Sequence, residues 1–210
     1  MVESTALVFV GGHCDTARIP PEMLSADIII AADSGQITAE KCGVIPHLIV
    51  GDFDSSDMPS DTDAEIIRVP AEKDDTDTML ACDMAIQRGA RRITILGGTG
   101  GRIDHSLSNL FLLEKWKVRG IDLVLCDGDN RVRVLLNETA LLRADGFRYF
   151  SLIALEPATV SVSGCKYPLH NASLIRTEPY AVSNEITDDA AQITVSGGAV
   201  LLIESGREPI

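Results

Sequence analysis

The chain has 210 residues, enough for one large domain or two small ones. Its formal net charge is -13 and it has no block of Lys or Arg, which argues against nucleic acid or an anionic membrane as a partner because both need clustered positive charge. No segment approaches the roughly 20 apolar residues that span a bilayer, and no secretory signal is visible at the N-terminus. The five scattered cysteines include no C-x-x-C pair and indicate buried thiols in a reducing cytosol.

The first 130 residues alternate apolar runs with amphipathic segments. Runs typical of buried strands cover 6–10, 27–32, 48–50, 66–69, 93–96 and 123–126. Helical patterns cover 37–42, about 76–88, and a segment from Ile103 that ends before Gly120 and is predicted to turn Ile103, Leu107, Leu110 and Leu113 towards a core. This alternation predicts an α/β fold, with a mostly parallel sheet flanked by helices.

After about Asn130 the pattern changes to short alternating segments without a convincing helix. The expected strands cover 131–135, 149–155, 159–163, 193–195 and 200–203, with turn residues between them. We therefore expect two domains, at 1–130 and 131–210, the second an antiparallel β-sandwich or barrel. The residues from Glu204 onward are expected to be frayed.

Two groups of aspartates lie on either side of one short apolar strand. Asp52 and Asp54 follow the run at 48–50, and on an extended backbone they project from the same side about 6–7 Å apart. Asp74 and Asp77 are three residues apart and would share a face of a first helical turn. Gathered carboxylates repel one another unless a cation neutralises them, so we predict a Mg²⁺ site. The alternative is a solvated acidic loop with helix-capping aspartates.

Other polar groups are expected at the same edge of the sheet. Asp33 and Asp127 each follow an apolar run, and ligands of open α/β sheets bind at the carboxyl ends of the strands. A lone Gly11-Gly12 pair after the first run is only a weak phosphate-loop signal. The run 97–101 is rich in glycine but lacks the Lys-Ser/Thr ending of a P-loop.

The segment 100–105 (GGRIDH) is a third candidate for the site. Its glycines allow phosphate to approach the backbone, and free N–H groups at a helix start favour anions. Arg102 offers a planar fork for phosphate oxygens, and Asp104 and His105 can orient a neutral or cationic partner. The alternatives are a helix cap at Asp104, an ion pair at Arg102 and a structural role for His105. Metal, cation and helix start together are the parts that phosphoryl transfer requires.

The succession of these motifs resembles the bacterial thiamine pyrophosphokinase family over nearly the whole chain. In order they are ADSG (32–35), GDFDS (51–55), DDTD (74–77), GGTGGRIDHSLSN (97–109) and SNE (183–185). The resemblance implies an ATP-binding catalytic domain at 1–130 and a thiamine-binding β-sandwich at 131–210. It also implies transfer of diphosphate from ATP to thiamine, giving thiamine diphosphate and AMP, by a cytoplasmic homodimer with thiamine at the subunit interface.

The same resemblance implies roles for individual residues. The catalytic group comprises Asp52, Asp54, Asp77 and Arg102, of which the three aspartates hold Mg²⁺. The ATP contacts are Asp33, Lys73, Asp74, Thr76, Asp77 and Arg102. The thiamine contacts are Asp104, His105, Ser183 and Asn184. Asp74 and Asp75 are both candidates for taking the proton of the alcohol. Animal and fungal members stack thiamine on a late tryptophan, whereas the only tryptophan of this chain is Trp116.

Two alternatives stay open from the sequence. A related diphosphokinase could use the same aspartates with another primary alcohol, such as a pterin alcohol, without needing the SNE segment. A catalytically silent nucleotide-binding or regulatory module is the second. The full set of aspartates argues against it, because a pure binder has little need for so many unneutralised carboxylates.

Overall fold

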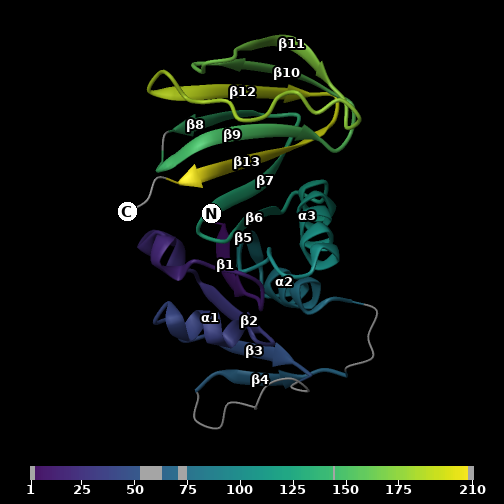
Figure 1. Cartoon of the computed structure of the whole chain (residues 1–210). Helices are drawn as coiled ribbons and strands as arrows, with labels where there is room; N and C mark the ends of the chain where they lie inside the picture. The colour runs from purple at the N-terminus through teal and green to yellow at the C-terminus, as the bar shows by residue number, and fades with distance from the viewer. Residues whose placement is uncertain (1–2, 53–62, 71–74, 144, 208–210) are drawn as a thin grey trace. The chain divides into compact units, whose positions relative to one another are not determined.

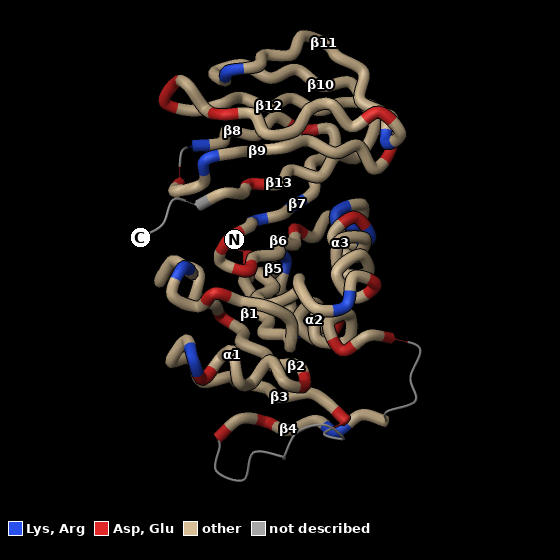
Figure 2. The backbone as a smooth tube through the Cα atoms, viewed as in Figure 1, with Lys and Arg blue, Asp and Glu red and all other residues tan. Residues whose placement is uncertain are grey.

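The computed structural model describes residues 3–52, 63–70, 75–143 and 145–207. The chain divides into two compact units, one of residues 1–116 and 120–128 and one of residues 117–119 and 129–210 (Figure 1). Within the described residues, no helix is long and apolar enough to cross a membrane. The five cysteines are all free, and Cys82, Cys126 and Cys165 are buried. Lys and Arg are distributed over both units (Figure 2).

The first unit contains a parallel sheet with helices on both faces. Its strands follow the spatial order β4-β3-β2-β1-β5-β6, and each neighbouring pair is parallel. Helix α1 lies on one face, and α2 and α3 lie on the other (Figure 1). The bounds are β1 Ser4–Phe9, β2 Ile28–Ala32, α1 Gly35–Lys41, β3 Leu48–Gly51, β4 Glu65–Arg68, α2 Asp77–Gln87, β5 Ala90–Leu96, α3 Ile103–Lys117 and β6 Asp122–Cys126. Two short 3-10 helices, η1 (Thr16–Arg18) and η2 (Pro21–Leu24), connect β1 to β2.

The strand order contains one switch point, between β1 and β5. The chain leaves β1 towards β2 on one side, and leaves β5 towards β6 on the other. The two connections diverge at the carboxyl ends of these strands, and such a divergence is where open α/β sheets form a ligand crevice. Strands β1 and β5 are apolar on both faces because helices cover both: the successive residues Leu7 and Val8 of β1, and Ile95 and Leu96 of β5, are each fully buried.

The second unit is built from two antiparallel sheets. One follows the order β7-β13-β9 and the other β11-β10-β12-β8. Side chains of both sheets, among them Phe150, Val160, Ile193 and Val200, form one buried cluster, so the unit is a β-sandwich. The bounds are β7 Asn130–Leu136, β8 Thr139–Arg143, β9 Phe147–Ala154, β10 Ala158–Ser163, β11 Leu169–Leu174, β12 Ala190–Ser196 and β13 Ala199–Arg207.

The structure confirms the expected fold class and corrects three details. Strands β8 and β11 were not expected from the sequence. The C-terminal segment is not frayed at Glu204, which is 2% exposed within β13 and accepts two hydrogen bonds from Arg131, of 2.7 and 2.6 Å. Helix α3 does not turn Ile103 and Leu107 towards a core, since they are 76% and 46% exposed. The helix buries Leu113, as expected, together with Leu112 and Asn109.

Candidate functional site

A cavity of about 420 Å³ lies at the switch point of the parallel sheet. Its walls are the segments that follow β1, β2 and β5 and the first turns of α2 and α3. The lining residues belong to 10–13, 32–34, 76–78 and 97–102, with His105 and Asn109 of α3. The cavity therefore occupies the place where a sheet of this order binds ligands, and it lies within the first unit.

The loops after β1 and β5 are in direct backbone contact beside this cavity. The N–H of His13 donates a hydrogen bond of 2.7 Å to the carbonyl of Thr99. A Cβ at Gly12 would lie 2.1 Å from the carbonyl oxygen of Gly97, and one at Gly100 would lie 2.6 Å from the Cβ of His13. Glycine is required at both positions because any side chain would separate the loops.

Buried polar groups fix the base of the β5 loop. The hydroxyl of Thr99 donates to the carboxylate of Asp127 at 2.5 Å, and Asp127 is only 4% exposed. Its carbonyl accepts the N–H of Asp15 at 2.8 Å. The amide of Asn109 donates to the carbonyl of Gly98 at 2.7 Å. Asp127 was expected at the ligand-binding edge of the sheet. It instead connects the loops after β1, β5 and β6 by hydrogen bonds and does not line the cavity.

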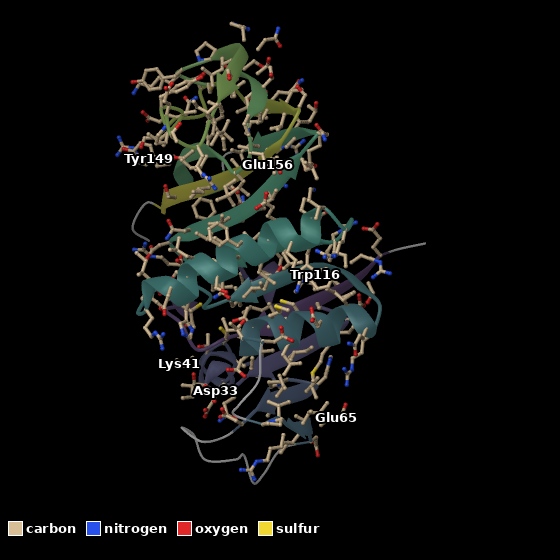
Figure 3. All side chains as sticks on the ribbon, turned by 90° about the vertical axis from the view of Figure 1, so that its right-hand side faces the viewer. Asp33, Lys41, Glu65, Trp116, Tyr149 and Glu156 are labelled. Atoms are coloured by element: carbon tan, nitrogen blue, oxygen red, sulfur yellow. The ribbon has the colours of Figure 1, made fainter. Side chains whose placement is uncertain are left out.

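Asp33 lies in the cavity wall directly after β2 (Figure 3). Its φ is 48°, a left-handed conformation that few side chains adopt and that recurs at functional sites. Its Oδ1 is buried and accepts no hydrogen bond from any described residue. Gly51 approaches it closely, since a Cβ there would lie 3.3 Å from the Cα of Asp33. A buried carboxylate oxygen without a donor fits a cation or the water that a cation carries.

The start of α2 forms the adjoining part of the wall. Thr76 is the N-cap, and its hydroxyl accepts the N–H of Met79 at 3.2 Å. Thr76 and Asp77 both line the cavity, whereas Asp52 is half-buried at the end of β3 and does not line it. The remaining expected residues of this group, Lys73, Asp74 and Asp54, lie outside the described residues.

The donor set fits Mg²⁺. Within the described ranges, no group of three or more His, Cys, Asp or Glu side chains is placed to hold a metal ion. Mg²⁺ usually binds through only one or two carboxylates and takes its other ligands from water and substrate phosphates. Asp33 and Asp77, two carboxylates on one cavity wall, supply that number.

At the start of α3 the expected phosphate and thiamine contacts are paired with each other. Arg102 donates hydrogen bonds of 3.1 and 2.5 Å to the two carboxylate oxygens of Asp104. These bonds hold the pKa of the Asp104 carboxyl at about 2, below its ordinary value of 3.8. Arg102 and His105 line the cavity and Asp104 does not. The two side chains of the pair are 72% and 60% exposed, so a ligand in the cavity can reach the guanidinium.

Ser183 and Asn184 lie in the second unit and differ in what they offer. Ser183 is exposed, with a φ of 55° and an N–H that donates to the hydroxyl of Ser151 at 3.0 Å. Asn184 is 7% exposed, and its side-chain oxygen accepts the N–H groups of Tyr167 and Glu185, each at 3.0 Å. Its side-chain nitrogen donates to the carbonyl of Tyr167 at 2.8 Å. Asn184 therefore holds the backbone of Tyr167, whose side chain stays exposed.

Sequence reasoning missed two groups of the wall. The segment after β1, with His13, lines the cavity, and the only signal for it was the Gly-Gly pair after an apolar run. The buried amide of Asn109 supports the β5 loop through Gly98; it closes the motif at 97–109, but sequence reasoning assigned it no role. Trp116, the tryptophan of the chain, lies in α3 of the first unit (Figure 3).

A switch-point cavity with carboxylates in one wall, a guanidinium in another and glycine loops between them defines an α/β enzyme that handles phosphate groups. Two family models match the chain in order. The first, thiamin pyrophosphokinase, catalytic domain, covers residues 21–125, and the second, thiamin pyrophosphokinase, vitamin B1 binding domain, covers residues 138–200. The chain belongs to the thiamin pyrophosphokinase family.

Individual relatives agree with this assignment. A thiamine pyrophosphokinase of Bacillus subtilis (strain 168) is 32% identical over 189 residues, which are 84% of this chain and 86% of the relative. The crystal structure of thiamine pyrophosphokinase from Bacillus subtilis has a TM-score of 0.84 at 27% identity and covers 97% of this chain and 100% of its own. A family member from Enterococcus faecalis has a TM-score of 0.81 at 30% identity, with coverages of 98% and 100%.

These matches confirm that the chain is an enzyme and that the family resemblance in the sequence is real. A match to a vitamin B1 binding domain favours thiamine over a pterin alcohol as the acceptor. The match to a catalytic domain argues against a silent binding module. Membership of a kinase family also implies ATP as the co-substrate.

Proposed function

We propose that this enzyme transfers a diphosphoryl group from Mg²⁺-bound ATP to the hydroxyl group of thiamine, giving thiamine diphosphate and AMP. In this proposal residues 1–130 form the ATP-binding catalytic domain, residues 131–210 form the thiamine-binding domain, and the enzyme acts in the cytoplasm. The observation that carries it is the cavity at the switch point, which combines carboxylates, a guanidinium and a helix start around one space.

The carboxylate part of the site would hold the metal. Asp77 lines the cavity beside the α2 cap, and Asp52 directly follows strand β3, which ends at Gly51. With Asp54 they are the proposed Mg²⁺ ligands. The buried Oδ1 of Asp33, which accepts no hydrogen bond from any described residue, would also be stabilised by the cation. When bound, Mg²⁺ would offset the charge of the triphosphate. Lys73, Asp74 and Thr76 complete the proposed ATP contacts.

The remaining wall would position the phosphates. The fork of Arg102 suits two phosphate oxygens, and the first N–H groups of α3 favour an anion. The glycines at 97–101 leave room for that approach. In the reaction the thiamine oxygen attacks the β-phosphorus in line and the bond to the AMP oxygen breaks, so positioning and charge stabilisation supply most of the rate enhancement. The alcohol proton passes to solvent or to a carboxylate, for which Asp74 and Asp75 are the candidates.

Thiamine would be held by Asp104, His105 and Ser183 in a homodimer, with Asn184 acting through the backbone of Tyr167 that its side chain holds. The exposed face of α3 supports a partner copy. Ile103, Leu107 and Phe111 follow one another at four-residue spacing and are 76%, 46% and 56% exposed, an apolar stripe of the kind that marks an interaction surface. The stripe begins beside Arg102, which lines the cavity. A second subunit on this stripe would therefore lie next to the phosphate-binding wall.

Product identification tests this function directly. The protein is incubated with ATP, Mg²⁺ and thiamine, and the nucleotide product is separated by chromatography. Formation of AMP and thiamine diphosphate in equal amounts is expected. ADP with thiamine monophosphate would mean transfer of the γ-phosphoryl group alone and would overturn the proposal. A parallel incubation with a pterin alcohol in place of thiamine is expected to give no AMP above the background without acceptor, and Asp77→Asn is the inactive control.

A further inference from the structure

His13 occupies a fixed place in the cavity wall that no assigned role explains. It follows Gly11-Gly12 in the loop after β1, is exposed and lines the cavity. Its backbone is held by the hydrogen bond to Thr99, and its Cβ lies against Gly100. The position of the imidazole is therefore set by the contacts of residue 13 with the β5 loop.

The charged groups of the cavity are separated by sign along the edge of the sheet. Among the described lining residues, the carboxylates are Asp33 after β2 and Asp77 at the start of α2. The basic side chains are His13 after β1 and Arg102 and His105 at the start of α3. Since β1 and β5 are neighbours at the switch point, the three basic groups come from adjoining segments. The cavity thus has an acidic part and a basic part.

The groups that surround His13 leave its imidazole free to meet an anion. In its own loop, Cys14 has a pKa raised by burial to about 12, so it is neutral. Asp15 pairs with Arg18 at 3.3 Å. From the β5 and β6 loops, Thr99 donates to the buried Asp127. From α3, Asp104 is taken by Arg102. The carboxylates of the wall, Asp33 and Asp77, belong to the other part of the cavity.

We propose that His13 binds a phosphate group of the nucleotide as its protonated imidazolium and so makes the affinity for ATP depend on pH. This inference rests on the proposed function, since it takes ATP as the ligand. An imidazole gains its charge between about pH 8 and 5, and a charged N–H donor gives a stronger bond to phosphate than a neutral one. His13 would act together with Arg102, which offers two donors from the adjoining segment at the start of α3.

The test compares the dissociation constants for ATP of the wild type and of His13→Gln at pH 6 and pH 8.5, with Mg²⁺ present. The ratio of the two constants removes the titration of ATP and of groups common to both proteins. We expect the dissociation constant of His13→Gln to exceed that of the wild type about tenfold at pH 6 and less than twofold at pH 8.5. For His13→Lys, which carries its charge at both pH values, the ratio of its dissociation constant for ATP to that of His13→Gln is expected to be the same at pH 6 and pH 8.5. His170→Gln, an exposed histidine of β11, is the matched control and should give a ratio of one.

Inorganic tripolyphosphate distinguishes a phosphate contact from a contact with the base. The same ratio of about ten at pH 6 is expected for it, whereas a loss confined to ATP would show contact with adenine and overturn the proposal. A ratio independent of pH would overturn it as well. If the wild type makes AMP and thiamine diphosphate while the ratio stays at one, only the inference on His13 fails. A wild type that neither binds ATP nor makes AMP contradicts the proposed function itself. Equal melting temperatures check that the exposed substitutions leave the fold intact.

Discussion

Arg102 and Asp104 form a two-bond ion pair at the entrance to α3, although the sequence assigns one to the nucleotide and the other to thiamine. The bonds measure 3.1 and 2.5 Å. Because the pair is exposed, it adds little to stability and is weakened by salt. Its consequence is chemical. A phosphate that takes the guanidinium leaves the carboxylate of Asp104 free, and a free carboxylate is the group that a cationic ring such as thiamine's requires.

Removing the guanidinium should change the titration of Asp104. The hydrogen bonds from Arg102 hold the pKa of Asp104 at about 2. A carboxyl whose pKa is lowered by folding contributes its stability above its unfolded value and loses it as the pH falls through its folded value, so in the wild type this loss is confined to the range from about pH 4 to 2. In Arg102→Gln we expect Asp104 to titrate at a higher pH than in the wild type, measured from the carboxyl carbon shift by NMR, while the N–H of His105 still donates to it at 3.0 Å.

Glu185 provides the internal control for that titration. Lys166 donates to it at 2.7 Å and lowers its pKa, and Arg102 takes no part in this pair. Its titration should therefore be the same in both proteins. An Asp104 that still titrates near pH 2 in Arg102→Gln would show that another group, rather than the guanidinium, stabilises its charge.

Asp33→Asn should lower the affinity of the enzyme for Mg²⁺ without lowering its thermal stability. Asparagine adopts the left-handed conformation at φ 48° about as readily as aspartate, so the melting temperature should stay within a degree or two. Loss of the buried anionic oxygen should raise the Mg²⁺ concentration for half-maximal AMP formation by about tenfold or more. An unchanged Mg²⁺ dependence would remove Asp33 from the metal site. Asp122→Asn, at the exposed start of β6, is the matched substitution and should leave activity as it is.

Gly12→Ala tests the contact between the β1 and β5 loops. The new Cβ would lie 2.1 Å from the carbonyl oxygen of Gly97, and the backbone must move to admit it. We expect a loss of about 1–3 kcal/mol in the free energy of unfolding, as for overpacked cores, together with a raised KM for ATP. Gly43→Asn is the control, since Gly43 has free space around it and a φ of 67° that asparagine accepts. Denaturant unfolding that gives equal stabilities for the two variants would contradict the packing argument.

The fold was predictable because its elements carry strong local patterns. The parallel strands are continuous apolar runs with a glycine or aspartate at their carboxyl ends, as at β1 and β3. Strand β11 has only Leu174 buried, and β8 only Ala140 and Leu142, so their patterns are too weak to separate them from loops. Helix α3 carries apolar residues on two faces. Periodicity correctly indicated Leu113, but it could not show that Leu112 packs while Ile103 and Leu107 stay exposed.

The site was predictable where a motif carried it and not where topology did. The motifs indicated Asp33, Asp77 and Arg102, and all three line the cavity. His13 has no motif of its own and enters the cavity only because β1 lies beside β5 in the sheet, which is a long-range property of the fold. Asn184 shows the converse. Its motif suggested a ligand contact, but its side chain is filled by hydrogen bonds to Tyr167 and Glu185.

Ser183 and Asn184 should therefore respond differently to substitution. Asn184→Ala leaves the backbone groups of Tyr167 without partners, and buried unsatisfied groups cost about 1–3 kcal/mol each, so its melting temperature should fall by several degrees. Ser183→Gly removes only an exposed hydroxyl and suits the φ of 55°. It should keep its stability while raising the KM for thiamine and leaving that for ATP unchanged. A stable Asn184→Ala, or a thiamine KM unaffected by Ser183→Gly, would contradict this division.

Leu107→Glu should separate the proposed homodimer. Leu107 is the middle residue of the apolar stripe on α3, between Ile103 and Phe111. A carboxylate there costs nothing in a monomer, where the position is already 46% exposed, but would be buried without a partner against a second copy. Sedimentation should show a dimer for the wild type and a monomer for the variant, with equal melting temperatures at low protein concentration. Leu141→Glu, exposed on β8 of the other unit, is the matched control.

Activity then decides whether the second copy matters to the site. If the partner completes the thiamine pocket, the monomeric variant should lose most of its AMP formation with thiamine while its affinity for ATP, set by the cavity of one chain, stays within about twofold. Mixing Leu107→Glu with the wild type should not restore the lost AMP formation. Every contact that the variant makes with a second copy would still go through its altered α3. A monomeric Leu107→Glu with full thiamine turnover would show that one subunit holds the whole site, and a Leu107→Glu protein that remains dimeric would place the interface on another surface.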